Sequence, residues 1–568
     1  MKKLQTTKKP LQTLKQEEFT PVAKKRIMRI ALVNPFQVTT NGYDMESVRR
    51  KGQLAEVPLG LAYISAYIKK YDYEVKIFDA HIMAVKGFTT GNCSSLEEVE
   101  DELISRIEEF NPDVIGISCL FHYMYRTAHQ IVGKIKTKMK NVTIVMGGAY
   151  PTVSPEIALS DKNIDFVVLG EGERAFLNLL EALNGRFNFD ELTAVAYRDK
   201  MGQIVIKSGF VLLDSLDDIP LPDRTDFVLE DYYRYGRHFI QKFEEYEGRE
   251  LKIATLTATR GCIFNCSFCL GKKIWGGGLR VRSPENVLNE IEFLKKKYGI
   301  KYFAFNDDNL LINKKFAREL LQGIIDKKLD IKWTTGGMSV CGLDEEMIEL
   351  MVKSGCLIFN LAIESASKET LERIHKPVTT DEAVRVVNMI RKHRDTYVMG
   401  LFMLGFLEET EEQFFETIKF GKALKCDWTL YSCVTPFPGS ELYYEAKTKE
   451  MLPENIEDDF EQLDFKSYVL NPRHLSKEFV LRERYFANLD QNFFENPNLS
   501  NGRTEIALSD FKNVIKLSPT HASAYYCIGK IYKKKGERTL AKQYYRLAKE
   551  NLSGLHKEYF KKLGLEIP

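Results

Sequence analysis

Three cysteines lie close together in the segment TRGCIFNCSFCLGKK, residues 259–273. They are Cys262, Cys266 and Cys269, a C-x3-C-x2-C pattern. Thiolates are soft ligands that select zinc, copper(I) or the iron of iron–sulfur clusters. A structural zinc site needs four protein ligands, and the third cysteine has no evident partner pair. A 4Fe–4S cluster held by three thiolates leaves one iron open. The pattern therefore favours such a cluster, with a structural or zinc site as the alternative.

The elements that carry these cysteines have the pattern of a barrel. Six strand-like segments alternate with helical patterns from Leu251 onward: IATLTATR, YFAFNDD, IKWTTGG, LIFNLAIES, YVMGLFMLGF and WTLYSCVTP. Six units are too few for a complete eight-stranded barrel, so the sequence predicts a partial (β/α)6 barrel over residues 251–470. The cysteines follow the first strand, at the end where such barrels carry their chemistry.

An earlier α/β segment covers residues 27–190. Its strand-like segments are RIALVNP, YEVKIFDA, DVIGISCL, VTIVMGG and FVVLGEGE, with helical patterns between them. This alternation predicts a Rossmann-like, doubly wound parallel sheet. Ligands of such sheets bind beyond the carboxyl ends of the strands. Ser118, the pair Gly147-Gly148 and the run 170–173 fall there.

The remaining segments differ in composition. Residues 1–26 are basic and lack an apolar run, which predicts a disordered tail and not a secretory signal. Residues 191–250 are irregular and predict a linker. Residues 471–568 are helical, with a 34-residue period that resembles the tetratricopeptide repeat. The period relates Ala507, Phe511 and Val514 to Ala541, Tyr545 and Ala548. So short an array is expected to dock on the catalytic body, a partner or a second copy, an ordinary helical hairpin being the alternative.

Composition excludes several classes of protein. The chain has 568 residues, a net charge of +2 and ten mostly scattered cysteines. Balanced charge argues against a dedicated nucleic-acid binder, and the cysteines do not form a disulfide framework. No stretch approaches the ~18 apolar residues of a spanning helix. We expect a cytoplasmic protein with no membrane span and no nucleic-acid partner.

The cysteine pattern after the first barrel strand resembles that of the radical S-adenosylmethionine superfamily. This resemblance implies that the open iron binds the amino and carboxylate groups of S-adenosylmethionine. Reduction, by a flavodoxin- or ferredoxin-type donor, then yields a 5′-deoxyadenosyl radical. Phe268 matches the aromatic residue that packs by the adenine in this family.

Other strand ends resemble family positions that bind the nucleoside and methionine groups. The positions are Asp307 and Asp308 at the methionine amine, Glu364 and Ser365 at the ribose and amine, and Gly405 and Glu408 at the adenine. The alternative for the two aspartates is a cap of the next helix. The sequence departs from the family at Leu407, where proline is usual, and at Met338, near a common arginine. Arg280 or Arg282 is the expected substitute for that arginine.

The first α/β segment is similar to the cobalamin-binding domain of one radical subfamily. The resemblance rests on Pro58 and Gly60, on Gly147 and Gly148 followed by Thr152, and on Glu171 and Gly172 within the run 170–173. Glycines at strand ends let the backbone approach a bulky ligand.

A lower cobalt ligand is a separate question. The run 79–84 nearly spells a motif that supplies a cobalt-binding histidine in other cobalamin proteins, but Ala84 replaces its glycine. We interpret His81 as an ordinary loop residue. His122, Tyr123 and Tyr125 are the candidates to line the lower face of the corrin.

The two modules together predict a cobalamin-dependent enzyme that methylates an unactivated carbon of a small-molecule, lipid or peptide substrate. Two alternatives stay open. One is an oxidative cyclase or rearrangement enzyme without net methyl transfer, and the other is an adaptor that acts through the helical repeats. Cys341 and Cys433 near strand ends are interpreted as core residues and not as hydrogen donors.

Overall fold

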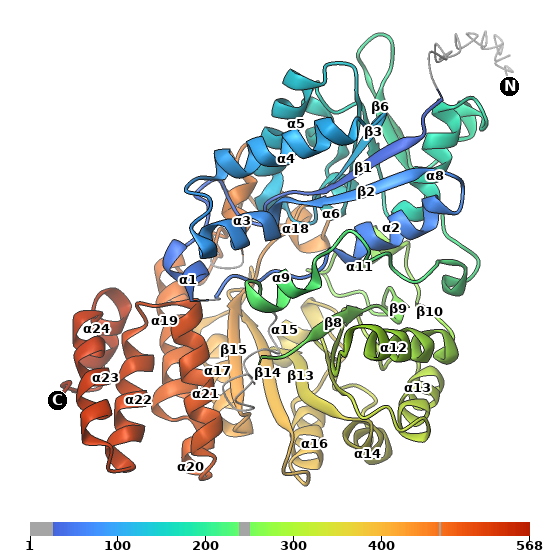
Figure 1. The fold of residues 1–568 in the computed structure, drawn as a ribbon. Coiled ribbons are helices and arrows are strands. Elements are labelled where there is room, and N and C mark those ends of the chain that lie inside the picture. Colours follow the sequence, from blue (N-terminus) through green and yellow to red (C-terminus); the bar gives the residue numbers. More distant parts are fainter. Residues whose placement is uncertain (1–25, 51, 238–249, 465–466) are drawn as a thin grey trace, which may run out of the picture.

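The computed structural model describes residues 26–50, 52–237, 250–464 and 467–568. A sheet domain stands above a partial barrel, and a group of C-terminal helices stands beside the barrel (Figure 1). The predicted tail over residues 1–26 lies, except for Arg26, outside the described residues. None of the helices in the described ranges is long and apolar enough to cross a membrane.

The upper domain is built on a seven-stranded sheet of order β2-β1-β3-β4-β5-β6-β7. Its first five strands are parallel and coincide with the five predicted segments. They are β1 (Arg29–Asn34), β2 (Glu74–Asp79), β3 (Val114–Ser118), β4 (Thr143–Gly147) and β5 (Phe166–Val168). The helices that cover them are α2 (Leu59–Lys69), α3 (Ala80–Thr90), α4 (Leu96–Phe110), α5 (Tyr125–Lys138), α6 (Ala149–Val153) and α8 (Gly172–Leu183). The α/β prediction is therefore confirmed.

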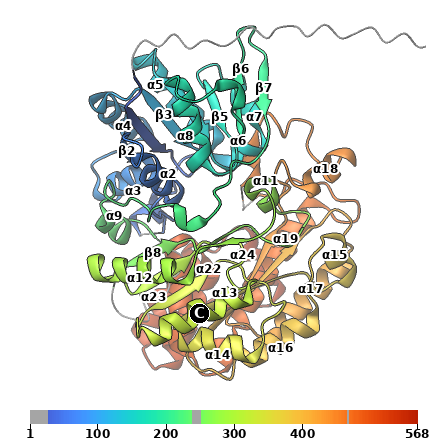
Figure 2. The ribbon, with the colours of Figure 1, turned by 90° about the vertical axis from the view of Figure 1, so that its right-hand side faces the viewer.

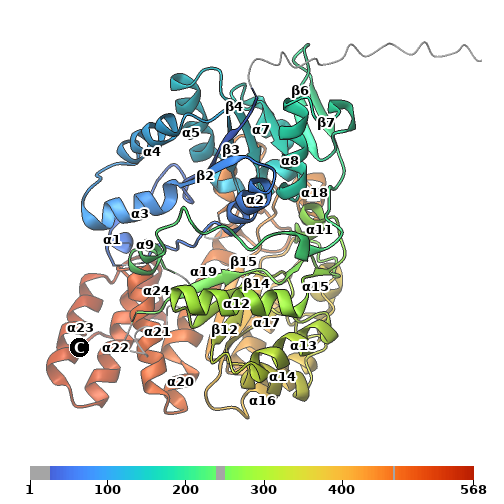
Figure 3. The same cartoon turned by 45° about the vertical axis from the view of Figure 1, so that its right-hand side comes forward.

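The predicted linker over residues 191–250 differs from the structure. Strands β6 (Val195–Arg198) and β7 (Ile204–Lys207) extend the sheet in antiparallel fashion. The tight turn between them is held by Asp199, whose carboxylate accepts the N–H groups of Met201 and Gln203. The signal was present as two β-rich runs around a turn containing Gly202. After this hairpin the chain passes between the two domains and forms α9 (Leu229–Arg234), as Figure 3 shows.

The lower domain is the predicted open barrel. Its six parallel strands pair in chain order, β8-β11-β12-β13-β14-β15. They are β8 (Ile253–Leu256), β11 (Tyr302–Phe305), β12 (Lys332–Thr335), β13 (Cys356–Glu364), β14 (Tyr397–Leu404) and β15 (Trp428–Cys433). Helices outside them include α12 (Pro284–Tyr298), α13 (Lys314–Asp326), α14 (Glu345–Lys353), α15 (Lys368–Arg373), α16 (Thr380–Ile390), α17 (Glu411–Leu424) and α18 (Glu441–Thr448). Two short antiparallel strands, β9 (Thr259–Arg260) and β10 (Arg280–Val281), enclose the cysteine segment.

The open edge of this sheet at β15 is covered by the C-terminal helices. Helix α19 (Lys477–Leu489) and the π-helical turn over Asp490–Phe494 lie against the strand. The amide of Asn492 accepts the N–H of Thr429 at 2.8 Å and donates to its carbonyl at 2.6 Å. Asn488 bonds both backbone groups of Tyr431 in the same way. These side chains satisfy polar groups that an edge strand otherwise exposes.

The last helices pack on one another behind this contact. They are α21 (Thr504–Leu517), α22 (Ala522–Lys534), α23 (Arg538–Glu550) and α24 (Gly554–Lys562). Gly529 lies against the ring of Tyr545, where a Cβ atom would come within 2.7 Å. The helical character is as predicted, and the segment docks on the catalytic body. Its relation to tetratricopeptide repeats stays a prediction.

We predict that Asn492→Ala lowers the free energy of unfolding by about 1–3 kcal/mol, because it leaves the buried N–H and carbonyl of Thr429 unpaired. Urea denaturation followed by circular dichroism measures this change. Gln543→Ala, which removes an exposed amide on α23, is the control and should change the free energy by less than about 0.5 kcal/mol. Equal effects of the two variants would contradict the stabilising role of the amide contact.

Candidate functional site

The three cysteines lie in the loop between β9 and β10. The helix that follows them in this loop, α11 (Gly271–Trp275), lies beneath the upper domain (Figure 2). Cys262 and Cys266 are half-buried, and Cys269 is exposed. The loop is held by backbone bonds from Ser267 N–H to the Ile374 carbonyl at 3.1 Å and from Leu442 N–H to the Ser267 carbonyl at 2.9 Å. The barrel thus fixes the middle of the loop from two directions.

The thiol groups are close enough to influence one another. Burial raises the pKa of Cys266 to about 11; Lys376 lowers this pKa, and Cys269 and Cys262 contribute to raising it. In the described part of the chain, no three His, Cys, Asp or Glu side chains converge as they would on a single metal ion. A cluster of several irons does not require such convergence, because each thiolate binds a different iron. The donor set therefore fits a 4Fe–4S cluster with three protein ligands.

Glu364 ends β13 in a strained conformation beside this loop. Its φ of +71° lies in the left-handed region, which is costly for a residue other than glycine. The carboxylate accepts a hydrogen bond from Lys376 Nζ at 2.9 Å, and the two side chains are 11% and 8% exposed. Despite burial, Glu364 and then Cys266 and Cys262 raise the pKa of Lys376. Lys376 therefore carries a positive charge beside the cysteines, and no sequence pattern had pointed to it.

The two aspartates at the end of β11 hold the start of the cysteine loop. Asp307 accepts the N–H of Ala258 at 3.0 Å and also that of Thr259. Asp308 accepts the N–H of Gly261 at 3.1 Å. Neither caps the next helix, which begins after Asn313. The alternative of a helix cap is therefore wrong, and binding of S-adenosylmethionine by the pair stays a prediction.

Several other predicted residues are engaged in contacts within the barrel. Phe268 is half-buried and packs against the barrel core. The Ser365 hydroxyl is fully buried and bonds Thr417 Oγ1 at 3.1 Å. Gly405 lies under Tyr468, whose hydroxyl donates to its carbonyl at 2.7 Å. Ser365 thus joins β13 to α17, and its predicted contact with S-adenosylmethionine competes with that hydrogen bond.

The expected arginine substitutes are both committed to carboxylates. Arg282 bonds Glu290 at 2.7 Å, with both side chains buried. Arg280 bonds Glu171 of the upper domain. The expectation that either binds the carboxylate of S-adenosylmethionine is not supported by these contacts. Met338 itself is buried and belongs to the hydrophobic core of the barrel.

A cavity of about 270 Å³ lies at the carboxyl ends of the upper strands. Its lining includes six residues predicted to bind cobalamin: Gly60, Ser118, Gly147, Gly148, Glu171 and Gly172. The cysteine loop supplies the facing wall with Arg260, Ile274 and Trp275, the last two on α11 (Gly271–Trp275). Gly148 has φ +109°, and a Cβ atom there would lie 2.3 Å from the Cys119 carbonyl, so only glycine fits.

Two predicted residues act behind this lining. Thr152 Oγ1 donates to the Gly148 carbonyl at 2.6 Å and accepts the N–H of Gly170 at 3.0 Å, which joins the two glycine turns. Pro58 stands at the N-terminus of α2. The structure thus brings the predicted cobalamin-binding residues to one site, with Pro58 and Thr152 in supporting positions.

The predicted lower-face residues are placed differently. His122 is buried beside Tyr150 and Phe460, and burial lowers its pKa to about 3. The Tyr125 hydroxyl donates to the Asp458 carbonyl. Neither these two residues nor Tyr123 belongs to the cavity lining, where Leu120 lies instead. The 3-10 turn over His122–Met124 directs this segment away from the cavity.

His81 is a helix residue of α3 and not the loop residue that we expected. Its Nε2 lies 2.7 Å from the Leu54 carbonyl and its Nδ1 lies 2.8 Å from the Tyr43 hydroxyl. Both ring nitrogens are thus engaged within the protein. The described residues that line the cavity include no His, Cys, Met or Lys.

Glu409, the residue after the predicted Glu408, carries the buried carboxyl group in the turn that follows β14. Glu408 pairs with Lys449 at 2.9 Å near the surface. Glu409 is fully buried, and its Oε2 accepts the N–H groups of Gly405 and Phe406. Burial raises the pKa of Glu409 to about 7. Sequence reasoning missed Glu409 because its role depends on the direction of the turn after β14.

Because the folded pKa of Glu409 is raised, the folded protein holds a proton between pH 4.5 and about 7 that the unfolded chain has released. We predict that stability falls as pH rises through this window, by up to about 3 kcal/mol. Urea denaturation of the wild type and of Glu409→Gln at several pH values measures the free energy of unfolding. The variant should lack the part of its pH dependence that comes from Glu409. Glu408→Gln is the control and should keep it. A Glu409→Gln slope equal to that of the wild type would contradict the assignment.

Comparison with known proteins agrees with this geometry. A family model described as the radical SAM superfamily matches residues 256–421, and one described as a B12 binding domain matches residues 47–180. An uncharacterized methyltransferase of Pyrococcus horikoshii is 30% identical over 75% of this chain and 85% of its own length. Cytidylyl-2-hydroxyethylphosphonate methyltransferase of Streptomyces wedmorensis is 28% identical over 79% of this chain and 86% of its own length.

Other relatives are named anaerobic magnesium-protoporphyrin IX monomethyl ester cyclases. Among solved structures, the cobalamin-dependent S-adenosylmethionine radical enzyme OxsB, with aqua-cobalamin and S-adenosylmethionine bound, superimposes with a TM-score of 0.63 at 14% identity. The match covers 95% of this chain and 80% of that chain, and it shows a shared fold. The chain belongs to the radical S-adenosylmethionine superfamily, among the members that also carry a cobalamin-binding domain.

Proposed function

We propose that this protein is a cobalamin-dependent radical S-adenosylmethionine methyltransferase that acts on an unactivated carbon. The observation that carries the proposal is the shared wall between the two sites. Ile274 and Trp275, which follow Cys269 by five and six residues, line the cavity at the upper strand ends. A corrin in this cavity and a cluster on the cysteines would therefore face the same loop.

The cofactors supply the hard chemistry when bound: one-electron reduction, radical formation from S-adenosylmethionine and methyl transfer from cobalamin. The chain holds and orients them. Cys262, Cys266 and Cys269 would bind the cluster. Glu364 and Lys376 place opposite charges beside the cysteines. Asp307 and Asp308 fix the start of the loop through its backbone N–H groups.

Binding of the corrin would use backbone in place of large side chains. The glycines at positions 147, 148, 170 and 172 bring main chain to the cavity surface. The lining has no His, Cys, Met or Lys side chain among its described residues. Backbone groups and apolar side chains would therefore hold the corrin, which supplies the methyl-transfer chemistry when bound.

Substrate and partners belong to the same proposal. A small-molecule, lipid or peptide substrate and a flavodoxin- or ferredoxin-type electron donor go with this chemistry, as does a cytoplasmic location. Oxidative cyclisation without net methyl transfer is the second candidate, and the cyclase relatives favour it. A partner or second copy at the outer face of the C-terminal helices is part of the same proposal, because α19 is itself occupied by its contact with β15.

Anaerobic turnover separates these activities. We predict that protein with a reconstituted cluster, hydroxocobalamin and a strong reductant retains cobalamin and forms 5′-deoxyadenosine and S-adenosylhomocysteine, both measured by mass spectrometry. Cys266→Ala should abolish both products, because it removes a cluster ligand, and Cys93→Ala, outside the loop, should not. 5′-Deoxyadenosine with retained cobalamin but without S-adenosylhomocysteine would favour the cyclase candidate. No cobalamin retention would contradict cobalamin dependence.

Lys376 should make the cluster easier to reduce, because its charge stabilises the added electron. We predict that Lys376→Gln lowers the cluster reduction potential, as measured by a redox titration followed by electron paramagnetic resonance. Lys368→Gln, an exposed lysine on α15, is the control and should keep the wild-type potential. An unchanged potential in Lys376→Gln would exclude this effect of the charge.

A further inference from the structure

One carboxylate of the upper domain holds both ends of the cysteine loop. Strands β9 and β10 pair so that Arg260 stands opposite Arg280. Arg260 Nη1 donates to Glu171 Oε2 at 2.7 Å, and both terminal nitrogens of Arg280 donate to the same carboxylate. Glu171 lies between β5 and α8 of the upper sheet. The loop over residues 261–279 is therefore closed at its base by a residue of the other domain.

With Glu173 these ionic groups are balanced in charge, and all of them except Arg280, whose side chain is 23% exposed, are buried. Arg260 also donates to Glu173 Oε1 at 2.5 Å. The side chains of Arg260, Glu171 and Glu173 are 7%, 4% and 6% exposed. We call these three residues and Arg280 the Glu171 clamp. A buried charge is costly unless its partner is in place, so the four side chains keep one arrangement together.

The clamp also forms part of the cobalamin cavity. Arg260, Glu171 and Glu173 belong to its lining. The guanidinium of Arg260 lies between two aromatic rings, 5.5 Å from the ring centre of Tyr63 and 5.6 Å from that of Trp275. Trp275 lines the cavity from the loop side. A ligand in the cavity would therefore contact groups whose positions fix the base of the cysteine loop.

Close backbone packing beside the clamp also joins the cysteine loop to the upper domain. Gly170 has φ +68°, and a Cβ atom on it would lie 3.2 Å from the carbonyl of Ile274 on α11. Gly276 approaches the ring of Phe210 in the upper domain, with a Cβ distance of 2.9 Å. Movement of the loop away from the sheet would therefore break close packing and ion pairs together.

We infer that the Glu171 clamp couples the binding of cobalamin to the binding of the cluster. This inference rests on the proposed function. A corrin in the cavity favours the clamped arrangement of the loop, and a cluster on the three cysteines favours the same arrangement. Each cofactor then raises the affinity for the other by an equal factor, because coupling between two binding sites is reciprocal. Arg280 is the positioning residue that this coupling requires outside the cavity.

The test is a titration with hydroxocobalamin, followed by absorbance, of full-length protein with and without its reconstituted cluster. The wild type should bind cobalamin at least about fivefold more tightly with the cluster, the lower end of typical coupling. Arg280→Gln detaches β10 from Glu171 and leaves the lining and the cysteines intact. For this variant, the dissociation constants for cobalamin with and without the cluster should be equal. Arg280→Lys keeps the charge but loses the paired contact, and should give an intermediate ratio.

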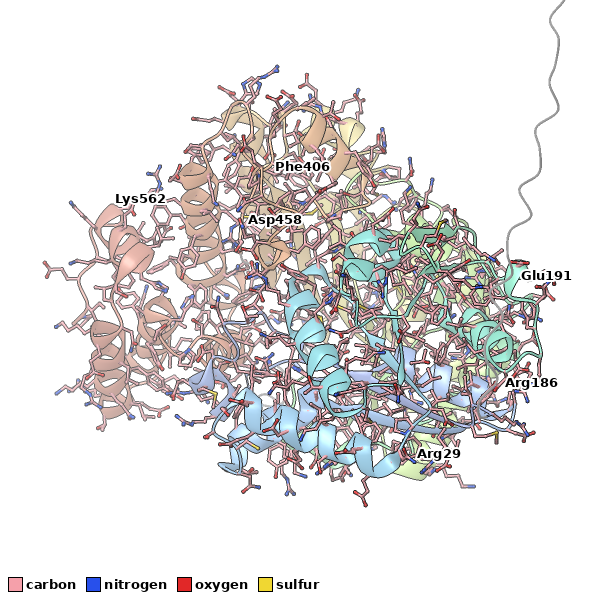
Figure 4. All side chains as sticks on the ribbon, turned by 90° about the horizontal axis from the view of Figure 1, so that it is seen from above. Arg29, Arg186, Glu191, Phe406, Asp458 and Lys562 are labelled. Atoms are coloured by element: carbon pink, nitrogen blue, oxygen red, sulfur yellow. The ribbon has the colours of Figure 1, made fainter. Side chains whose placement is uncertain are left out.

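Arg186→Gln is the matched control. It breaks an arginine–glutamate contact of the same kind, with Glu181, at the outer margin of the upper domain (Figure 4). This variant should keep the wild-type ratio. Circular dichroism of each variant, with and without the cluster, checks that the chain is folded.

Either of two results would overturn this inference and leave the proposed function intact. The first is cobalamin binding in the wild type that does not depend on the cluster. The second is a ratio of dissociation constants in Arg280→Gln that equals the wild-type ratio. Loss of cobalamin binding by Arg280→Gln in both forms would also overturn it, since Arg280 would then contribute directly to binding. A wild type that binds no cobalamin in either form would contradict the proposed function as well. The two failures are therefore distinguishable.

Discussion

The arrangement of the two domains depends on a buried ion pair next to the first cysteine. Arg260 lies two residues before Cys262, and its guanidinium is held by Glu171 and Glu173 of the sheet domain. Burial of Glu173 depends on that arginine, and burial of Glu171 depends on it together with Arg280. The same side chains line the cavity for which we propose cobalamin binding, and they form the base of the cysteine loop. The distance between the two cofactor sites is thus set by side chains that neither domain could bury alone.

The barrel meets a different requirement, because its six-stranded sheet is open, with β8 and β15 at its edges. Strand β15 would expose its N–H and carbonyl groups along one edge. The amides of Asn488 and Asn492 bond that edge as a neighbouring strand would. The C-terminal helices therefore serve the catalytic body directly, whatever their outer face contacts.

One buried ion pair lies beside the cysteines at the barrel mouth. Glu364 adopts a strained backbone conformation at the end of β13, and Lys376 is buried against it beside the cysteines. Strain of this kind persists only where the surroundings enforce it, and it is common at functional sites. The aspartates of β11 contribute by a different route, through hydrogen bonds to the backbone of the cysteine loop.

The sequence by itself determined the six-stranded barrel sheet and the five parallel strands of the upper sheet. It also singled out the three candidate cluster cysteines and six of the residues that line the cavity at the upper strand ends. Periodicity and spacing are local, and strand ends of parallel sheets necessarily meet at one edge. The sequence missed the β6–β7 hairpin. It also predicted His122, Tyr123 and Tyr125 beside the corrin, but none of the three lines the cavity. Only the tertiary structure decided the partners of Arg260 and Arg280 and the charge of Lys376 beside Glu364. Long-range pairing of this kind leaves no periodic signal, because it depends on which surfaces the folded domains bring together.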